Sequence, residues 1–258
     1  MNEMSYRTAL VTGASSGLGR GLALWLGKRG VKVYAAARRR AHLEELAQEA
    51  RAAGAHVEPV ELDVSHADAT LERIRALDEA CGGLDLVVAN AGVGGQTNAR
   101  DFPWEHARKV IDVNVTGAAA TLSAVLPRMV ERNRGHLVGV SSLASCRGLP
   151  QNAAYSASKA FLNTFLESLR VDLRGTQVRV TCIKPGFVKT EMTAHIQHTM
   201  PFLLEADAAV ELMGQAILRA EAEYGFPWQM ARAVGVAKFV PNLLFDAVAS
   251  KVLRAPRG

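Results

Sequence analysis

The chain has 258 residues, of which 49% are hydrophobic and 21% charged, which is typical of globular domains with a substantial core. Its net charge of +5 does not indicate nucleic-acid binding, because no stretch of the sequence concentrates the basic residues as such a site requires. Three cysteines without metal-ligand spacing, no leader-like start and no apolar run long enough to cross a bilayer predict free thiols, a cytoplasmic location and no metal site.

Short apolar runs alternate with longer amphipathic runs along most of the chain. Strands are predicted at 8–12, 31–37, 56–64, 84–92, 135–142 and 178–186, and helices at 17–30, 41–54, 68–82, about 104–133 and about 155–174. Continuous apolar strands separated by helices are typical of a parallel sheet that is covered on both faces. We therefore predict an α/β fold with three layers in one domain, 1–258, whose last seventy or so residues form helices and loops.

The segment TGASSGLG, residues 12–19, lies between the first predicted strand and the first predicted helix. Gly13, Gly17 and Gly19 permit a tight turn and a close approach of the backbone to a ligand. The N–H groups at the start of the helix carry partial positive charge, so this loop favours a bound diphosphate. No Gly-Lys-Ser/Thr follows, which argues against a nucleoside triphosphate loop. A turn without any ligand is the alternative.

The second predicted strand indicates which dinucleotide is bound. NAD sites place an acidic residue near the end of this strand to bind the ribose hydroxyls, whereas here Ala37 is followed by Arg38, Arg39 and Arg40, and the first acid is Glu44. Guanidinium groups bind a ribose 2′-phosphate through paired hydrogen bonds. Cations at a helix start oppose the helix dipole, so a bound anion explains them better than a solvated surface does. NADP(H) is therefore predicted over NAD(H).

Candidate catalytic side chains follow later strands. Tyr155 and Lys159 are four residues apart at the start of a predicted helix and so share one face. Ser141 and Ser142 end the preceding strand, and Asn114 lies in the helix before it. In a parallel sheet these positions converge at the carboxyl edge, beside the glycine loop.

Taken together these motifs resemble the short-chain dehydrogenase/reductase family from about residue 7 to residue 192. The resemblance is carried by residues 12–19, Asn90-Ala91-Gly92, Asn114, Ser141-Ser142, Tyr155-x-x-x-Lys159 and Pro185-Gly186-x-x-x-Thr190. It implies a one-domain Rossmann-type doubly wound sheet, a nicotinamide cofactor and a Ser-Tyr-Lys site supported by Asn. By the spacing in the family, Ser142 and not Ser141 is the active serine.

The expected chemistry is hydride transfer coupled to proton transfer. Tyr155 is the expected general acid/base, and a nearby ammonium such as that of Lys159 lowers the pKa of a phenol. The resemblance implies that Lys159 also binds the nicotinamide ribose and that Asn114 holds a water that relays protons. Ser142 is expected to stabilise charge on the substrate oxygen.

Other cofactor positions are carried over from the matching motifs. In the glycine loop they include Ser15, Ser16 and Leu18 with the three glycines. Asp63 and Val64 are expected to flank the adenine, and Asn90, Ala91 and Gly92 to line the cofactor floor. The nicotinamide is expected to be bordered by Pro185, Gly186, Val188 and Thr190.

Residues 191–230 occupy the place of the family's variable substrate lid. Their apolar members are Met192, Ile196, Met200, Phe202, Leu203 and Leu204. An apolar lid favours a hydrophobic or bulky substrate, and packing of these residues on the core is the alternative. His195 and His198 lack further ligands for a metal. Arg147, Gln151 and Asn152 leave the polarity of the substrate open, since Arg147 would suit an acidic group.

The remaining expectations concern partners. The tail, about 231–258, alternates apolar and basic residues and is expected to pack on its own domain or a partner subunit, with membrane contact the less favoured alternative. The helices at 155–173 and 104–133 are apolar on more than one face, and in the family these form subunit contacts, so a homodimer or homotetramer is expected. The leading hypothesis is an NADP(H)-dependent oxidoreductase acting on a small carbonyl or alcohol. The rival is an NADP(H)-binding sensor or scaffold without turnover.

Overall fold

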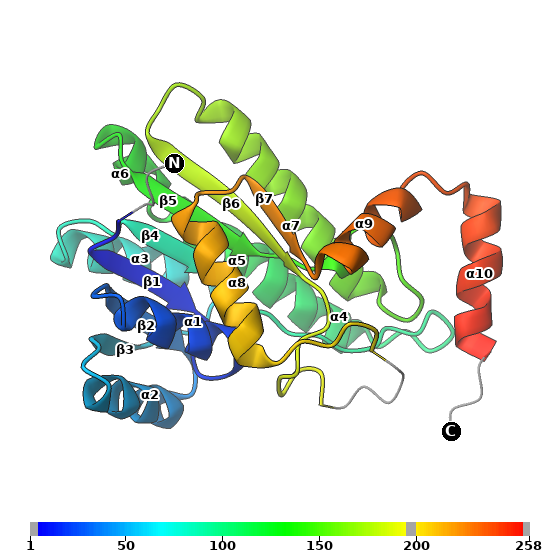
Figure 1. The fold of residues 1–258 in the computed structure, drawn as a ribbon, viewed down its shortest axis with the longest axis horizontal. Helices are drawn as coiled ribbons and strands as arrows, with labels where there is room; N and C mark the ends of the chain where they lie inside the picture. The colour runs from blue at the N-terminus through cyan, green and yellow to red at the C-terminus, as the bar shows by residue number, and fades with distance from the viewer. Residues whose placement is uncertain (1–4, 195–199, 255–258) are drawn as a thin grey trace.

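The computed structural model describes residues 5–194 and 200–254, with side chains as far as residue 249. Within these residues a seven-stranded parallel sheet has the order β3-β2-β1-β4-β5-β6-β7 (Figure 1). The strands are β1 Thr8–Thr12, β2 Lys32–Ala37, β3 Val57–Glu61, β4 Leu86–Ala89, β5 Gly135–Val140, β6 Val178–Pro185 and β7 Glu223–Phe226. The order reverses direction between β1 and β4, which is where a doubly wound sheet opens a crevice for ligands.

Helices cover both faces of the sheet, so the three-layer Rossmann-type fold predicted from the sequence is confirmed. Residues along each strand alternate between two buried clusters, one on each face, as the twofold repeat of a strand requires. The helical segments are α1 Gly17–Gly27, α2 Arg40–Ala52, α3 Ala67–Ala80, α4 Trp104–Ile111, η1 Asp112–Gly117, α5 Ala118–Ser123, α6 Leu126–Glu131, η2 Leu143–Ser145, α7 Ala153–Asp172, α8 Ala206–Leu218, α9 Trp228–Ala237 and α10 Asn242–Arg254.

The strand β7 corrects the expectation that the last seventy residues contain only helices and loops. It is four residues long, pairs with β6 alone, and has the sequence EYGF. A short edge strand with a glutamate and a glycine lacks the apolar run that marks the inner strands. The sequence pattern therefore misses it, although Phe226 is fully buried.

The long helix expected at 104–133 is divided into α4, η1, α5 and α6. A π-helical segment, η1, separates α4 from α5, and it contains the buried Asn114. The run Trp104–Glu131 is long and apolar enough by composition to cross a membrane, contrary to expectation, but 56% of its most apolar stretch is buried within the protein. Such burial is what a helix packed on a sheet shows.

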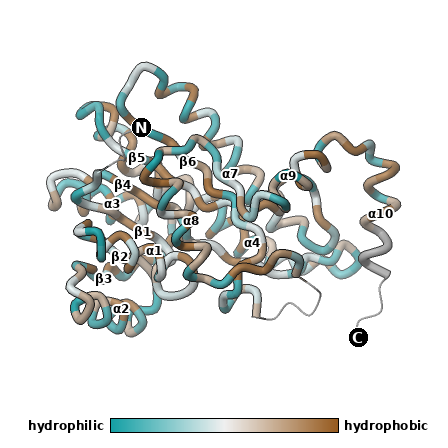
Figure 2. The backbone as a smooth tube through the Cα atoms, viewed as in Figure 1, coloured by the Kyte–Doolittle hydropathy of each residue, from teal (hydrophilic) through white to brown (hydrophobic). Residues whose placement is uncertain are grey.

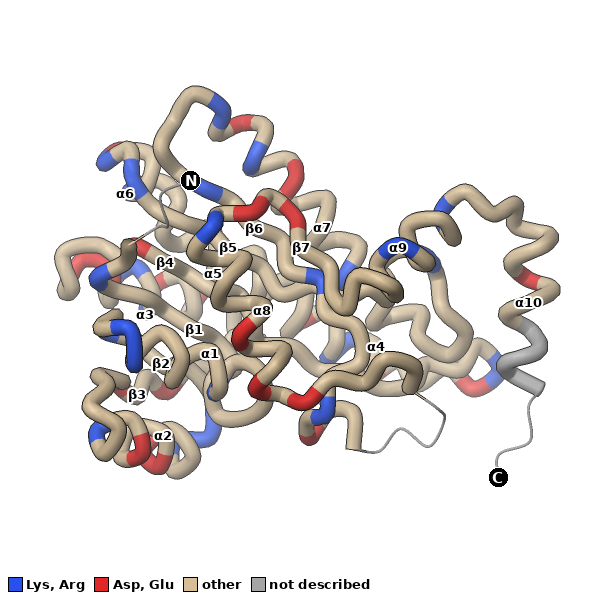
Figure 3. Tube along the Cα trace, in the orientation of Figure 1, with Lys and Arg blue, Asp and Glu red and all other residues tan. Residues whose placement is uncertain are grey.

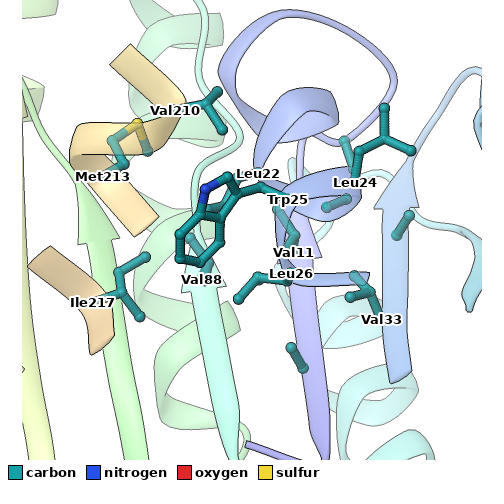
Figure 4. Close-up of a cluster of buried hydrophobic side chains, with 14 of the residues drawn as sticks. Val11, Leu22, Leu24, Trp25, Leu26, Val33, Val88, Val210, Met213 and Ile217 are labelled. Carbon is teal, nitrogen blue, oxygen red and sulfur yellow. The ribbon is translucent and has the colours of Figure 1, made fainter. Parts of the chain in front are cut away.

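The side chain of Trp25 on α1 packs against α8 and so connects that helix to the core (Figure 4). Its indole packs against Met213 and Ile217, and its Nε1 donates a hydrogen bond to the Glu211 carboxylate at 2.6 Å. A Cβ at Gly214 would lie 2.5 Å from the indole ring, so glycine is needed for this close approach. The helix α8 is therefore part of the core.

The structure narrows the region expected to act as a substrate lid, 191–230. The helix α8 and the strand β7 belong to the packed domain, whereas residues 191–193 lie at the cleft described below. Three of the residues singled out in this region, His195, Ile196 and His198, lie outside the described residues.

Candidate active site

The carboxyl ends of the central strands surround a cleft of about 440 Å³. The crevice lies where the strand order reverses, as the fold predicts. Its lining brings together all the residues expected to bind the cofactor: Gly13, Ser15, Ser16, Gly17, Leu18, Gly19, Arg38, Arg39, Asp63, Val64, Asn90, Ala91, Gly92, Tyr155, Lys159, Pro185, Gly186, Val188 and Thr190. Ser142 lines the same cleft, and Asn114 lies just behind it.

The glycine loop takes a shape that other residues would not permit. Gly13 and Gly17 have φ values of +67° and +55°, in the left-handed region that favours glycine. A Cβ at Gly19 would lie 2.5 Å from the Gly13 carbonyl oxygen and would also collide with the side chain of Asn90. Asn90 Nδ2 in turn donates to the Thr12 carbonyl oxygen at 2.9 Å, which ties the end of β4 to the end of β1.

The N-terminus of α1, which follows the glycine loop, has no side-chain cap. Ser16, at the N-cap position, makes no capping hydrogen bond to the helix. The first N–H groups of α1 therefore lack the side-chain partner that a cap supplies, and they carry the positive end of the helix dipole. This arrangement suits a phosphate group.

Two arginines after β2 border the cleft, and the third does not. Arg39 Nη2 donates to the hydroxyls of Ser15 and Ser16 at 3.1 and 2.7 Å, and its guanidinium also meets the Glu191 carboxylate at 3.5 Å. Arg38 lies 3.8 Å from the Asp63 carboxylate. The glycine loop and the end of β2 thus present guanidinium groups side by side.

Arg40 differs from its two neighbours in where its side chain is engaged. It pairs with Glu44 at 2.8 Å on α2 and is absent from the lining of the cleft. Because its side chain lies outside the cleft, substitution of Arg40 can serve as a control for substitutions of Arg38 and Arg39 in cofactor binding.

Ser142, Tyr155 and Lys159 meet at the inner end of the cleft. Tyr155 and Lys159 lie on the first turns of α7, and Lys159 Nζ is 5.9 Å from the centre of the Tyr155 ring. The side chains of Ser142 and Tyr155 are hydrogen-bonded to each other. The Lys159 side chain is buried and its Nζ donates to the Val140 carbonyl oxygen at 2.8 Å.

The two titratable groups of this site have shifted pKa values. Burial raises the pKa of Tyr155 above its ordinary value, and the hydrogen bond with Ser142 opposes that shift. Burial lowers the pKa of Lys159 to about 8. In this structure the ammonium of Lys159 is directed to the Val140 carbonyl, so the expected lowering of the phenol pKa by Lys159 is not present here.

The two neighbouring serines play different parts. The Ser141 hydroxyl donates to the Lys159 carbonyl oxygen at 3.0 Å, and its N–H donates to the Ile183 carbonyl oxygen. The Ser142 hydroxyl accepts from the Ala144 N–H at 3.1 Å and meets Tyr155. Ser141 therefore holds α7 against β5, while Ser142 faces the phenol.

Asn114 braces the loop that follows β4. Its Oδ1 accepts from the Val93 N–H at 2.8 Å, and its Nδ2 donates to the Val93 carbonyl oxygen at 2.9 Å and to the Ser158 hydroxyl at 3.1 Å. A Cβ at Gly92 would lie 3.3 Å from Lys159 Nζ and 3.4 Å from Asn114 Oδ1, so the amide and the ammonium flank the same glycine. The π-helical turn of η1 points the amide toward this spot, and π-helical turns often occur at functional sites.

Several residues that line the cleft were not assigned to the cofactor or the catalytic site from the sequence, although three of them, including Met192, fall in the expected lid. Glu191, Met192 and Thr193 line the cleft beyond Thr190. Val93 lines it too, and the rule that strand ends converge would have identified it. Nothing in the sequence predicts that Glu191 reaches Arg39.

Three polar residues before α7 have structural partners. Arg147, considered above for an acidic substrate group, instead binds carbonyl oxygens of the C-terminal segment. The backbone carbonyl oxygen of Gln151 accepts from the Thr97 N–H at 2.7 Å. Asn152 pairs with Thr97 in a β-bridge, and its Nδ2 donates to the Pro150 carbonyl oxygen at 3.1 Å. These contacts join the loop before α7 to the loop after β4.

No group of three or more metal-ligating side chains comes together in the part of the chain that the structure describes. Cys81, Cys146 and Cys182 are free thiols.

The chain is similar to known proteins over nearly its whole length. The family model described as short chain dehydrogenase matches residues 7–201. An uncharacterized oxidoreductase of Myxococcus xanthus is 71% identical over 252 residues, which cover 98% of this chain and 100% of the relative.

Solved structures share the fold at lower identity. A short chain dehydrogenase/reductase from Burkholderia phymatum, in complex with NAD, is 27% identical with a TM-score of 0.82, covering 91% of this chain and 93% of its own. An alcohol dehydrogenase from the archaeon Thermococcus sibiricus, complexed with 5-hydroxy-NADP, is 27% identical with a TM-score of 0.76, covering 85% and 95%.

Proposed function

The chain belongs to the short-chain dehydrogenase family, and we propose that it is an NADP(H)-dependent oxidoreductase that interconverts a carbonyl and an alcohol. The observation that carries the proposal is the meeting of Ser142, Tyr155 and Lys159 with the glycine loop in one cleft. A dinucleotide suits this cleft because the uncapped start of α1 faces it, where a diphosphate is favoured, and Arg38 and Arg39 border it.

A bound nicotinamide cofactor supplies the hydride in reduction and accepts it in oxidation. In reduction the Tyr155 phenol donates its proton to the substrate oxygen as negative charge develops there, and in oxidation the phenolate takes the proton back. Ser142 donates a hydrogen bond to the same oxygen and stabilises its charge. Lys159, with its pKa near 8, passes protons between the Tyr155 phenol and the Asn114 side of the cleft.

Turnover of a panel of carbonyl substrates by the wild type, and its loss in Tyr155→Phe, test this function. The rival is a protein that binds NADP(H) without chemistry. Ser142, Tyr155 and the buried Lys159 place groups suited to proton transfer at one point of the cleft, and a protein that only binds the cofactor has no need of proton transfer. This arrangement supports an enzyme over a protein that only binds the cofactor.

The choice of NADP(H) over NAD(H) rests on Arg38 and Arg39, since the similar structures were solved with either type of cofactor. We expect Arg38→Ala and Arg39→Ala each to raise the Kd for NADPH about tenfold or more, because each loses a charge-assisted bond to the 2′-phosphate. The Kd for NADH is expected to change by less than about twofold, because NADH lacks that phosphate. Fluorescence titration of the reduced cofactors measures both constants.

Arg40→Ala is the matched control for this experiment. It removes the same charge from the same segment, but Arg40 pairs with Glu44 outside the cleft. An equal loss of NADPH binding in Arg40→Ala, or an equal loss of NADH binding in the other two variants, would refute the assignment of the 2′-phosphate site.

The two serines provide a second test. We expect Ser142→Ala to lower kcat about a hundredfold, because a hydrogen bond to the developing oxyanion is lost. Ser141→Ala is expected to leave kcat within about threefold but to lower the free energy of unfolding by about 1 kcal/mol, because its hydroxyl bonds the α7 backbone. Steady-state kinetics and urea unfolding separate the two effects, and a reversed pattern would transfer the active role to Ser141.

Apolar side chains at the cleft support a largely apolar substrate. Met192 lines the cleft and remains 49% exposed, and Phe202 and Leu203 are exposed on the segment that precedes α8. Only residues 191–205 are proposed as the lid, because α8 is packed on α1.

A homodimer or homotetramer is proposed through the outer face of α7 and its neighbour α4. Phe161 and Phe165 stack on each other there and are half-buried, and Val171 is exposed. Such apolar surface on a helix is typical of a subunit contact.

A further inference from the structure

We define the C-terminal arm as residues 228–258, and its described part, 228–254, stands apart from the domain. Its helices α9 and α10 extend to one side of the sheet in Figure 1, and α9 has no buried residue. Its described apolar side chains are largely exposed: Phe239 87%, Leu243 82%, Val236 68%, Val248 66%, Trp228 61% and Leu244 58%. An apolar surface of this kind on a terminal segment marks an interaction site.

The loop between β5 and α7 holds the arm to the domain. Arg147, in the loop between β5 and α7, donates to the carbonyl oxygen of Ala237 at 3.1 Å and to the Asn242 side chain at 2.7 Å. The same guanidinium lies 4.0 Å from the centre of the Phe245 ring. These contacts join the two helices to the domain and leave Leu243 and Leu244 exposed.

The arm also carries most of the net charge of the protein. It contains five basic residues and one acidic residue, a net charge of +4, whereas residues 1–227 contain 25 basic and 24 acidic residues. Residues 1–227 taken together are close to electrically neutral, whereas the arm is not. The partner that fits this charge is anionic.

We propose that the C-terminal arm binds the surface of an anionic lipid bilayer. Exposed tryptophan, phenylalanine and leucine beside arginine and lysine are typical of segments that lie in the headgroup region. The Arg232 guanidinium lies 4.9 Å from the centre of the Trp228 ring, and Lys238 directly precedes Phe239 in the sequence. The trace of α9 includes basic positions in Figure 3, and the coloured part of α10 is largely apolar in Figure 2. The apolar side chains would enter the acyl boundary while the cations meet lipid phosphates.

Charge also argues against a second copy of the chain as the occupant. Two arms facing each other would bring two segments of +4 together, and residues 1–227 offer a net charge of only +1 to an incoming arm. A bilayer that contains phosphatidylglycerol or phosphatidylserine offers a dense negative surface instead. The proposal is independent of the reaction that the cleft catalyses.

The test is sedimentation of the full-length protein with vesicles of about 30% phosphatidylglycerol in phosphatidylcholine, compared with pure phosphatidylcholine. We expect binding to the anionic vesicles to exceed binding to the neutral ones about tenfold and to fall when salt is raised to about 0.5 M. Phe239→Ser with Leu243→Ser, and separately Arg232→Glu with Lys238→Glu, are each expected to lower binding about tenfold. All four side chains are substantially exposed or half-buried on the arm, so the domain core is not touched.

The matched control for the charge reversal is Arg73→Glu with Arg75→Glu, which changes the net charge by the same amount on the exposed face of α3. This control is expected to bind the anionic vesicles like the wild type. Thermal unfolding of every variant verifies that the fold is retained.

Three results would overturn the proposal. One is failure of the wild type to sediment with the anionic vesicles, and another is equal loss in the α3 control. The third is a lipid-free oligomer, seen in analytical ultracentrifugation, that the Phe239→Ser, Leu243→Ser variant dissociates, because the arm would then cover a second copy of the chain.

Discussion

Tyr155→Phe is expected to lower kcat for reduction of a carbonyl by a factor of about 10²–10⁴, because the substitution removes the proton donor and little else. Phenylalanine keeps the ring that packs at the start of α7, so the cleft should retain its shape. The Kd for NADPH is therefore expected to stay within about threefold of the wild-type value. The measurement is the decay of reduced-cofactor absorbance with a panel of apolar ketones and aldehydes, together with cofactor titration by fluorescence.

The same pair of measurements separates the enzyme from the sensor. If the wild type binds NADPH but turns over no member of a broad panel, the rival hypothesis of a binding protein is favoured. If Tyr155→Phe is as active as the wild type, the catalytic assignment is wrong even though the protein is an enzyme. Tyr224→Phe serves as a matched control, because this tyrosine lies on β7, outside the lining of the cleft, and loses the same hydroxyl.

The arrangement of the cleft follows from sequence rules to a large extent. Once alternating strands and helices indicate a parallel sheet, the strand ends at Thr12, Ala37, Ala89 and Val140 must lie along one edge. The residues that follow these ends were therefore expected near one another, and the structure does bring them together. The sequence also predicted a tight turn at the glycines of residues 12–19. The structure gives the reason at Gly19, because a Cβ there would collide with the Gly13 carbonyl oxygen.

Features that depend on long-range packing were not predictable in the same way. The strand β7 is defined by pairing with β6 rather than by its own residues, and the π-helical turn at Asn114 has no composition that distinguishes it from an α-helix. Arg147 reads as a free cation in the sequence, and its true partners are backbone carbonyls about ninety positions away, at Ala237 and Val240. Backbone carbonyls exist at every position, so no pattern of residue types identifies them as partners.

The pKa values of Tyr155 and Lys159 are another feature that the sequence does not predict. The spacing of Tyr155 and Lys159 predicts that they share a helix face, and they do. Spacing does not predict burial, however, and burial dominates both groups by raising the pKa of the phenol and lowering that of the amine. The proton transfer proposed above therefore needs a change of environment when substrate and cofactor enter, which a sequence cannot describe.

Acid is expected to destabilise the protein through one buried histidine far from the cleft. His136 on β5 is fully buried, its Nδ1 lies 2.6 Å from the Tyr6 hydroxyl, and its Nε2 lies 2.8 Å from Thr181 Oγ1. The Tyr6 hydroxyl donates to the Ile217 carbonyl oxygen, so the neutral imidazole can donate from Nδ1 to Tyr6 and accept at Nε2 from Thr181. Burial lowers the pKa of His136 to about 3.

The sign of the effect follows from proton uptake in the two states. Between about pH 6.5 and pH 3 the unfolded chain carries a protonated histidine at position 136 while the folded protein does not, so unfolding takes up a proton. The stabilisation is complete above the unfolded pKa and is lost as the pH falls toward 3. For this histidine alone, the free energy of unfolding is expected to be about 2 kcal/mol lower at about pH 5 than at about pH 7.

Urea unfolding at several pH values measures this dependence, and His136→Gln isolates the contribution of the imidazole. The variant is expected to be less stable than the wild type at neutral pH, because glutamine does not fit the hydrogen-bonded pocket, but the gap should shrink toward pH 5 since glutamine takes up no proton. His56→Gln is the control, because the His56 side chain is 64% exposed and its replacement does not touch the buried network of His136. A gap between wild type and His136→Gln that stays constant from about pH 7 to pH 5 would show that His136 titrates alike in both states, and the buried network would then contribute to stability without any dependence on pH.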